Sequence, residues 1–125
     1  MTEVLVDTSI WVDHFRRRND TLVYLLNQDR VLIHPMVLGE IACGTPPSRQ
    51  KTLSELCDLR HAQQPSHPEI LAFVEQQKLY GLGCGLVDIT LLAAALMSHA
   101  QLWTLDKRLI ALATRLAVAH QPRLH

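Results

Sequence analysis

At 125 residues with 48% hydrophobic side chains, the chain is long enough to bury a substantial core, and we expect a single domain over residues 1–125. Its 12 basic and 12 acidic residues cancel, so bulk charge does not indicate binding to nucleic acid or to a membrane surface. The longest apolar run, residues 91–97, is too short to span a bilayer, and the first residues lack the basic and apolar segments of a secretory signal.

Short apolar runs alternate with helical patterns along the whole chain. In chain order we expect a strand at Val4–Val6, a helix carrying Trp11 and Phe15, a helix at 19–28, a strand at Val31–Ile33, a helix from Pro35 to Gly44, helices at 49–59 and 69–80, a buried helix at 89–100, a strand at 101–106, a helix at 107–116 and an edge strand at 117–121. The candidate helix starts are Thr8 or Ser9, Asp20 or Thr21, Pro35 in a first turn, and Ser48. This alternation predicts an α/β fold with four or five parallel strands and helices on both faces.

Three cysteines lie far apart in the sequence: Cys43, Cys57 and Cys84. Their odd number and wide spacing do not form a disulfide or metal pattern. We therefore expect reduced thiols, mostly filling the core, in a cytoplasmic protein.

Four acids stand where the predicted topology has its ligand edge. In open parallel sheets, ligands bind outside the carboxyl ends of the strands. Asp7 and Asp106 each terminate an expected strand, and Asp88 begins the buried helix after a glycine-rich stretch. Glu40 lies in the helix that follows the second strand. Acids from distant parts of the chain could therefore meet at one edge.

Each acid also has a purely structural interpretation. Asp7 and Asp88 could be N-caps, Asp106 could favour the helix dipole, and Glu40 could be a solvated helix position. Taken together the acids favour another interpretation, because clustered carboxylates repel and take up protons unless a cation lies among them. Oxygen ligands of this kind suit Mg²⁺ or Mn²⁺, and such a metal can activate water and hold a phosphate oxygen.

Four motifs in order, "VDTSIWVD", "PMVLGEIACG", "GLVDITLLAAAL" and "LWTLDKRL", resemble a PIN-domain ribonuclease. More narrowly, they resemble a VapC-type toxin of a type II toxin–antitoxin pair. The likeness covers nearly the whole chain, and it implies a PIN-like three-layer α/β/α sandwich. It also implies RNA as the substrate, a cognate antitoxin as a partner, and a homodimer.

The resemblance carries roles onto individual residues. It implies that Asp7, Glu40, Asp88 and Asp106 are catalytic, with a divalent metal held mainly by Asp7 and Asp88 and with Asp106 nearby. The metal would activate water for in-line attack on an RNA phosphodiester, while Glu40 would hold a second metal or orient the water. Three hydroxyl residues match positions that support the acids: Thr8, Ser9 and Thr104.

Basic residues near these motifs are candidates for RNA contact. Lys107 and Arg108 follow Asp106 directly and are well placed to touch phosphate. The run Arg16–Arg18 could equally serve the end of its helix, where cations favour the dipole. The seven histidines show no metal-binding spacing, and "GLGCG" lacks the context of a phosphate loop, so we interpret it as a flexible wall of the site.

Two other functions remain open from the sequence. A receiver-like phospho-acceptor domain has a similar size, sheet and set of magnesium-binding acids. It usually pairs two acids after its first strand and carries a late Lys-Pro, whereas here Asp7 stands alone and no Lys-Pro occurs. A PIN-like fold could also serve only as a binding module, although the presence of all four acids argues against that.

Overall fold

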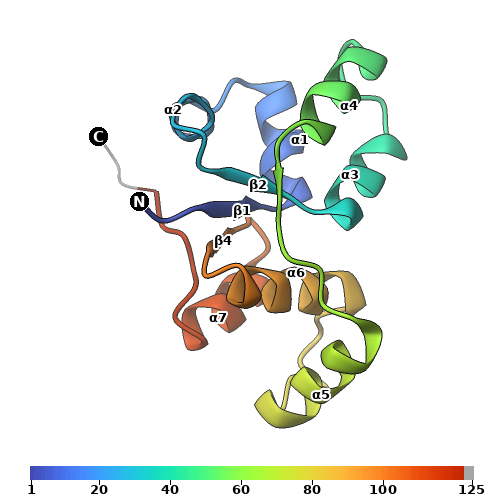
Figure 1. The fold of residues 1–125 in the computed structure, drawn as a ribbon, viewed down its shortest axis with the longest axis vertical. Coiled ribbons are helices and arrows are strands. Elements are labelled where there is room, and N and C mark those ends of the chain that lie inside the picture. Colours follow the sequence, from blue (N-terminus) through green and yellow to red (C-terminus); the bar gives the residue numbers. More distant parts are fainter. Residues whose placement is uncertain (123–125) are drawn as a thin grey trace.

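The computed structural model describes residues 1–122, and within them four short strands form one parallel sheet (Figure 1). The strands are β1 (Val4–Val6), β2 (Val31–Ile33), β3 (Arg60–His61) and β4 (Gln101–Trp103). Their spatial order is β3–β2–β1–β4, so β1 pairs with β2 on one side and with β4 on the other. All three residues of β1 are completely buried, which is why this central strand is a continuous apolar run.

Helices cover both faces of the sheet, as predicted. Their bounds are α1 (Thr8–Arg16), α2 (Asp20–Asn27), α3 (Pro35–Ala42), α4 (Arg49–Cys57), α5 (His67–Gln77), α6 (Leu86–Met97) and α7 (Lys107–Arg115). Figure 1 shows α1 to α4 on one side of the sheet and α5 to α7 on the other. The chain therefore has the expected three layers, with the sheet between two layers of helices.

The most deeply buried helix is α6, where residues 89–95 are buried without a break. The apolar sequence of this segment predicted its burial, although the helix begins at Leu86, three residues earlier than expected. Trp11 and Trp103 both lie in the core. Across the described residues, no helix is both long and apolar enough to cross a membrane.

Two helix starts differ from the sequence-based expectation. Thr8 or Ser9 as the cap of α1 was wrong, because Asp7 takes this position and its carboxylate accepts a hydrogen bond from the Thr8 backbone N–H. Ser48 precedes α4 as expected, but its left-handed backbone (φ 46°) leaves its hydroxyl without a capping hydrogen bond. Asn19 caps α2 from the residue before Asp20. Pro35 lies in the first turn of α3, as predicted.

The edges of the sheet were the least predictable part of the fold. Strand β3 was missed because both of its residues are exposed and polar, so it has no apolar pattern. The expected edge strand at 117–121 is reduced to a single parallel bridge between Ala119 and Leu102. The prediction that the cysteines fill the core was wrong for two of them, since Cys43 and Cys57 are exposed.

Candidate functional site

The sheet brings the ends of β1 and β4 together at a point where the strand order reverses. The chain runs outward from β1 through β2 to β3 and returns to place β4 on the other side of β1. In open α/β sheets, the crevice at such a reversal is where ligands bind. Asp7 follows β1 directly, and Asp106 lies three residues after β4. Both acids therefore belong to the edge that the sequence indicated.

Asp7 is the most tightly held of the four acids. Its side chain is buried, with 8% of the residue exposed. Its Oδ1 accepts a hydrogen bond from the Thr8 backbone N–H at 2.8 Å. Its Oδ2 accepts one from the Ser9 hydroxyl at 2.9 Å and another from the Thr104 hydroxyl at 2.7 Å. Three donors therefore fix the orientation of this carboxylate.

The same two hydroxyls connect Asp7 to the segment that carries Asp106. Ser9 Oγ accepts a hydrogen bond from the Leu105 backbone N–H at 3.0 Å. Thr104 Oγ1 accepts one from the Asp106 backbone N–H at 3.1 Å. Each hydroxyl thus donates to Asp7 and accepts from the turn between β4 and α7. This pair of contacts sets the position of the turn relative to β1.

Asp106 caps α7 from an exposed position. Its Oδ1 accepts hydrogen bonds from the backbone N–H groups of Arg108 and Leu109, at 2.9 and 3.1 Å. The interpretation that Asp106 stabilises the start of its helix is therefore correct for Oδ1. A capping carboxylate still has a second oxygen for another ligand, and Asp7 likewise caps a helix, α1, through one of its oxygens.

Glu40 approaches the edge from α3. Its Oε1 accepts a hydrogen bond from the Thr8 hydroxyl at 2.7 Å, which joins α3 to the start of α1. The hydroxyl of Thr8 therefore contacts Glu40, whereas those of Ser9 and Thr104 contact Asp7. Glu40 itself is exposed, so its carboxylate faces solvent beside the buried Asp7.

Asp88 is the acid whose electrostatic environment reveals the cluster. It is the third residue of α6, and its pKa is raised above the ordinary value. Burial is the largest cause, followed by the negative charges of Asp106 and Asp7 and then that of Glu40, while the Gly85 backbone N–H acts in the opposite direction. Asp88 therefore lies close enough to the other three acids to be destabilised by their charges.

The four carboxylates share one edge, but they do not form a closed metal cage. Within residues 1–122, no three His, Cys, Asp or Glu side chains converge closely enough to hold an ion. We expected Asp7, Asp88 and Asp106 within one ion's reach, and this spacing is not formed. Hydroxyls hold Asp7 and the backbone of α7 holds one oxygen of Asp106, so each of these carboxylates is oriented by its own hydrogen bonds.

The donor atoms at this edge nevertheless fit a hard divalent cation. The acids and their supporting hydroxyls offer only oxygen atoms, which is the ligand type of Mg²⁺ and Mn²⁺. The nearest softer group is the thiol of Cys84, whose pKa is raised by burial and by the charges of Asp88 and Asp106. Apart from this thiol, the donor atoms are all oxygens, the kind that magnesium and manganese prefer.

Comparison with known proteins decides the family. The chain matches the PIN domain family over residues 4–115. It is a PIN-domain protein. The ribonuclease VapC32 of Mycobacterium tuberculosis is 41% identical over 117 residues, covering 93% of this chain and 94% of that protein, in two strains alike. The resemblance carried by the four motifs is therefore confirmed, and the receiver-like alternative is excluded.

Solved structures of low sequence identity agree on the fold. PAE2754 from Pyrobaculum aerophilum superposes with a TM-score of 0.59 at 19% identity, covering 93% of this chain and 90% of that one. VapBC-1 from nontypeable Haemophilus influenzae superposes with a TM-score of 0.67 at 14% identity, covering 90% of this chain and 92% of that one. The predicted PIN-like three-layer fold is therefore correct.

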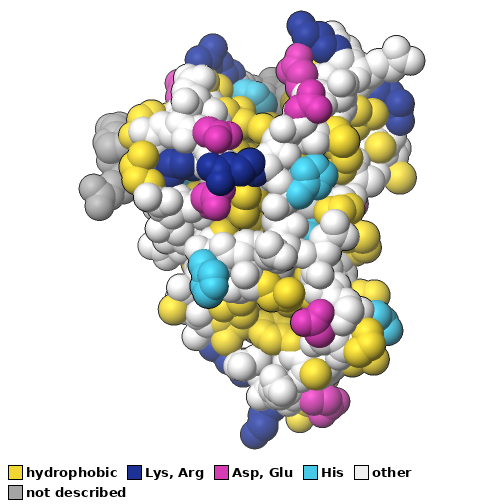
Figure 2. All heavy atoms as spheres, viewed as in Figure 1, with side chains coloured by type: hydrophobic (Ala, Val, Ile, Leu, Met, Phe, Trp, Pro, Cys, Tyr) yellow, Lys and Arg dark blue, Asp and Glu magenta, His cyan; other side chains and the backbone are white. Residues whose placement is uncertain are grey.

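The basic residues that the sequence indicated as candidates for RNA contact lie at the start of α7 and at the end of α1. Lys107 and Arg108 lie exposed in the first turn of α7, and the Arg108 side chain reaches across to the Gly83 carbonyl. In the run Arg16–Arg18, Arg18 pairs with Asp20 at 3.0 Å on the surface. On the face drawn in Figure 2, basic and acidic side chains are interspersed among apolar ones, without a broad basic patch. On this face, a contact with phosphate would therefore involve single basic side chains.

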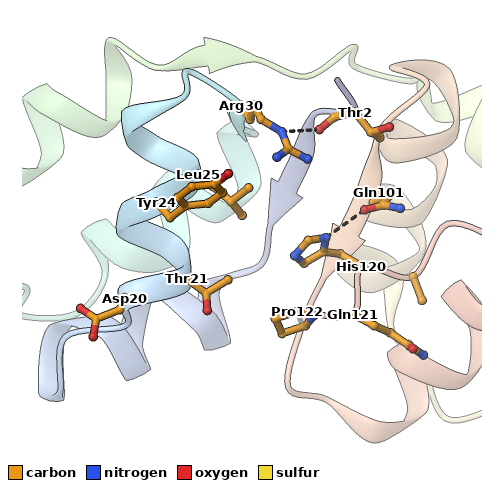
Figure 3. A pocket seen from close by; sticks show the side chains of 11 residues that line it. Thr2, Asp20, Thr21, Tyr24, Leu25, Arg30, Gln101, His120, Gln121 and Pro122 are labelled. Atoms are coloured by element: carbon orange, nitrogen blue, oxygen red, sulfur yellow. Dashed lines mark hydrogen bonds between the residues drawn. The ribbon is translucent and has the colours of Figure 1, made fainter. Parts of the chain in front are cut away.

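A wide pocket of about 1160 Å³ lies away from the acids (Figure 3). It opens between α2 and the segment at 119–122, and its polar lining includes Thr2, Arg30 and Gln101, which precede or begin β1, β2 and β4. These residues mark the amino ends of the strands, opposite the acidic edge. Arg30 donates to the Thr2 carbonyl, and His120 Nδ1 forms a hydrogen bond with Gln101, whereas His120 Nε2 is buried without a partner.

Proposed function

We propose that this protein is a metal-dependent endoribonuclease toxin whose activity a cognate antitoxin blocks. The family and the relative named ribonuclease VapC32 support cleavage of RNA. The observation that carries the proposal is the set of acids at one sheet edge, where hydroxyl groups join the segments of Glu40, Asp7 and Asp106. The raised pKa of Asp88, caused by burial and then by the charges of these acids, places a fourth carboxylate near them. An uncompensated acidic cluster at the ligand edge of a parallel sheet is what a cation-dependent phosphodiesterase requires.

Each acid has a proposed role in this reaction. Asp7, Asp88 and Asp106 would hold Mg²⁺ or Mn²⁺, which supplies an activated water and a positive charge against the phosphate oxygens. Ser9 and Thr104 keep the Asp7 carboxylate in one orientation while the substrate binds.

Glu40 is exposed and anchored through one oxygen by Thr8, so its other oxygen can accept a proton from the attacking water. Binding a second ion is the other role open to it. Lys107 is the basic side chain that we expect to contact the phosphate backbone.

The partners follow from the family resemblance. A cognate antitoxin would silence the site until it is degraded or diluted, and both proteins would act in the cytoplasm. A homodimer rests on the resemblance alone, and the molar mass of the purified protein, measured by sedimentation, is its direct test.

A cleavage assay tests the proposal. Purified protein should cut single-stranded RNA when Mg²⁺ or Mn²⁺ is present, and a chelator should stop it. Asp7→Asn keeps the shape and the capping oxygen but removes the charge, so we expect a loss of at least about 100-fold in rate. Expression of the wild-type chain without its antitoxin should arrest bacterial growth, and Asp7→Asn should relieve the arrest.

The control is Asp13→Asn in α1, an exposed acid outside the cluster, which should cleave like wild type. RNA binding without any metal-stimulated cleavage would support the non-catalytic binding module instead. Equal growth arrest by wild type and Asp7→Asn at equal protein levels would remove Asp7 from the mechanism.

A further inference from the structure

We propose that Arg108 is a positioning residue that ties the glycine-rich loop before α6 to the start of α7 and so sets the spacing between Asp88 and Asp106. The proposal refines the proposed nuclease site and rests on it for its functional meaning. It also changes the role of Arg108, which the sequence indicated as a phosphate contact. We define the loop as residues 81–85, between α5 and α6.

The contact itself is specific to a glycine. Arg108 Nη1 donates a hydrogen bond to the Gly83 carbonyl oxygen at 3.2 Å. Gly83 has a φ of 83°, a left-handed conformation that side chains rarely adopt. A Cβ atom at this position would lie 2.9 Å from Nη1, 3.1 Å from Cζ and 3.2 Å from Cδ of Arg108. The arginine side chain therefore lies directly against the bare Cα of Gly83.

Arg108 contacts both acid-bearing segments at once. Its backbone N–H donates to the Asp106 carboxylate at 2.9 Å, while its side chain holds Gly83. Two residues after Gly83, Gly85 directly precedes α6, the helix that carries Asp88. Arg108 thus joins the segment that carries Asp106 to the loop that leads into the helix of Asp88.

The loop needs such an anchor because it has little structure of its own. Gly81 and Gly83 are both left-handed, and Gly85 precedes α6 without a side chain that could cap the helix. Asp88 and Asp106 repel each other, which tends to push the start of α6 away from α7. A guanidinium group at the loop opposes this separation by a direct bond and by its positive charge.

Two glycine variants separate the contact from backbone strain. Gly83→Ala places a Cβ against the Arg108 side chain, whereas Gly81→Ala meets nothing within 4 Å, and both positions are left-handed (φ 83° and 71°). Both variants should lower the melting temperature because alanine is strained there. Only Gly83→Ala should also displace the Arg108 side chain from the loop. When Arg108 is already replaced by Ala, there is no arginine side chain left to displace. Gly83→Ala and Gly81→Ala should then change hydrogen exchange of the loop amides by the same amount.

Hydrogen exchange of the metal-free protein gives a readout that does not depend on activity. In Arg108→Ala the loop amides at 82–86 should exchange about fivefold faster than in wild type, because a hydrogen bond from a charged donor is lost. Lys107→Ala, the neighbouring cation, should leave this exchange unchanged. Mn²⁺ binding, measured by paramagnetic resonance, should weaken about tenfold in Arg108→Ala and not in Lys107→Ala.

Binding of RNA at several salt concentrations distinguishes the two roles of Arg108. Lys107→Ala should reduce the slope of log affinity against log salt by about one, as expected for a lost phosphate contact, while Arg108→Ala should leave the slope unchanged. The inference is overturned if Arg108→Ala reduces the slope and leaves loop exchange as in wild type. If wild type binds no Mn²⁺, the proposed function fails, and loop exchange still decides whether Arg108 holds Gly83.

Discussion

Asp7 and Asp88 lie at the same edge of the sheet, but the chain holds them by different means. Asp7 is buried, follows a central strand, and accepts hydrogen bonds from one backbone N–H and two hydroxyls. Asp88 follows a loop with two left-handed glycines and lies in a helix that no side chain caps. Its pKa is raised, because burial and neighbouring acids disfavour its charge.

This difference indicates that Asp7 and Asp88 contribute to the site in different ways. On the Asp7 side, hydrogen bonds from one backbone N–H and two hydroxyls fix the orientation of the carboxylate. On the Asp88 side, burial and neighbouring acids disfavour the negative charge. We therefore propose that a cation bound at this edge would stabilise the Asp88 side more than the Asp7 side.

The largest effect should come from removing a support of Asp7. Thr104→Val keeps the shape of the side chain but removes the donor to Asp7 Oδ2 and the acceptor of the Asp106 N–H. We expect the free energy of unfolding to fall by about 1–3 kcal/mol, because buried polar groups lose their partner, and the Mn²⁺ affinity to fall at least about tenfold. Urea unfolding and a metal titration measure the two effects.

Thr8→Val is the matched control, because the hydroxyl of Thr8 binds the exposed Glu40 rather than Asp7. It should change the free energy of unfolding by no more than about 0.5 kcal/mol. Comparable losses in the two variants would mean that Asp7 is not held by its hydroxyl partners more firmly than Glu40 is held by Thr8.

A smaller effect of opposite sign is expected on the Asp88 side. The raised pKa means that the folded protein binds the Asp88 proton more tightly than the unfolded chain does. The corresponding stability is present below the ordinary pKa and is lost as the pH rises through the raised value. Asp88→Asn should therefore increase the free energy of unfolding of the metal-free protein at neutral pH, and this gain should shrink toward acidic pH.

Asp88→Asn also separates the effect on stability from the effect on cleavage. Mg²⁺ should raise the melting temperature of wild type and have little effect on Asp88→Asn, which should also lose cleavage. Asp7→Asn provides the contrast, since it should lose both cleavage and stability. A lower stability of Asp88→Asn at neutral pH would show that the contact with the Gly85 N–H outweighs the repulsion.

The sequence predicted the parts of this site that depend on strand order. A buried apolar run ending in an acid places Asp7 at the carboxyl edge of the sheet, and the same logic applies to Asp106. The alternation of strands and helices was sufficient for the sheet type and for both helical layers. The four motifs identified the family, which the match over residues 4–115 confirms.

What the sequence could not predict depends on side-chain contacts between distant segments. The hydroxyl of Thr8 reaches Glu40, 32 positions away, and Arg108 reaches Gly83, 25 positions away. Neither contact has a local pattern. Strand β3 consists of two exposed residues whose pairing with β2 depends on the rest of the sheet, so periodicity gave no signal for it.

The smallest expected effect concerns a third buried polar group at the same edge, His34, which follows β2 and caps α3. It is 3% exposed, and its Nδ1 accepts a hydrogen bond from the Met36 backbone N–H at 3.0 Å. This bond requires the neutral ring, and burial, followed by the charge of His61, lowers the pKa of His34 below 6.5. Stability from this group is therefore present above the ordinary pKa and is lost as the pH falls through 6.5 and below.

His34→Asn should make stability less dependent on pH, because asparagine can still cap the helix but does not titrate. The measurement is urea unfolding about one pH unit above and one below the ordinary histidine pKa of about 6.5. The slope of unfolding free energy against pH should decrease by at most about 1.4 kcal/mol per pH unit, the limit for one proton. Burial also lowers the pKa of His14 and His120, so part of the slope should remain. An unchanged slope in His34→Asn would mean that the cap of α3 tolerates the charged ring, and that His34 does not contribute to the pH dependence of stability.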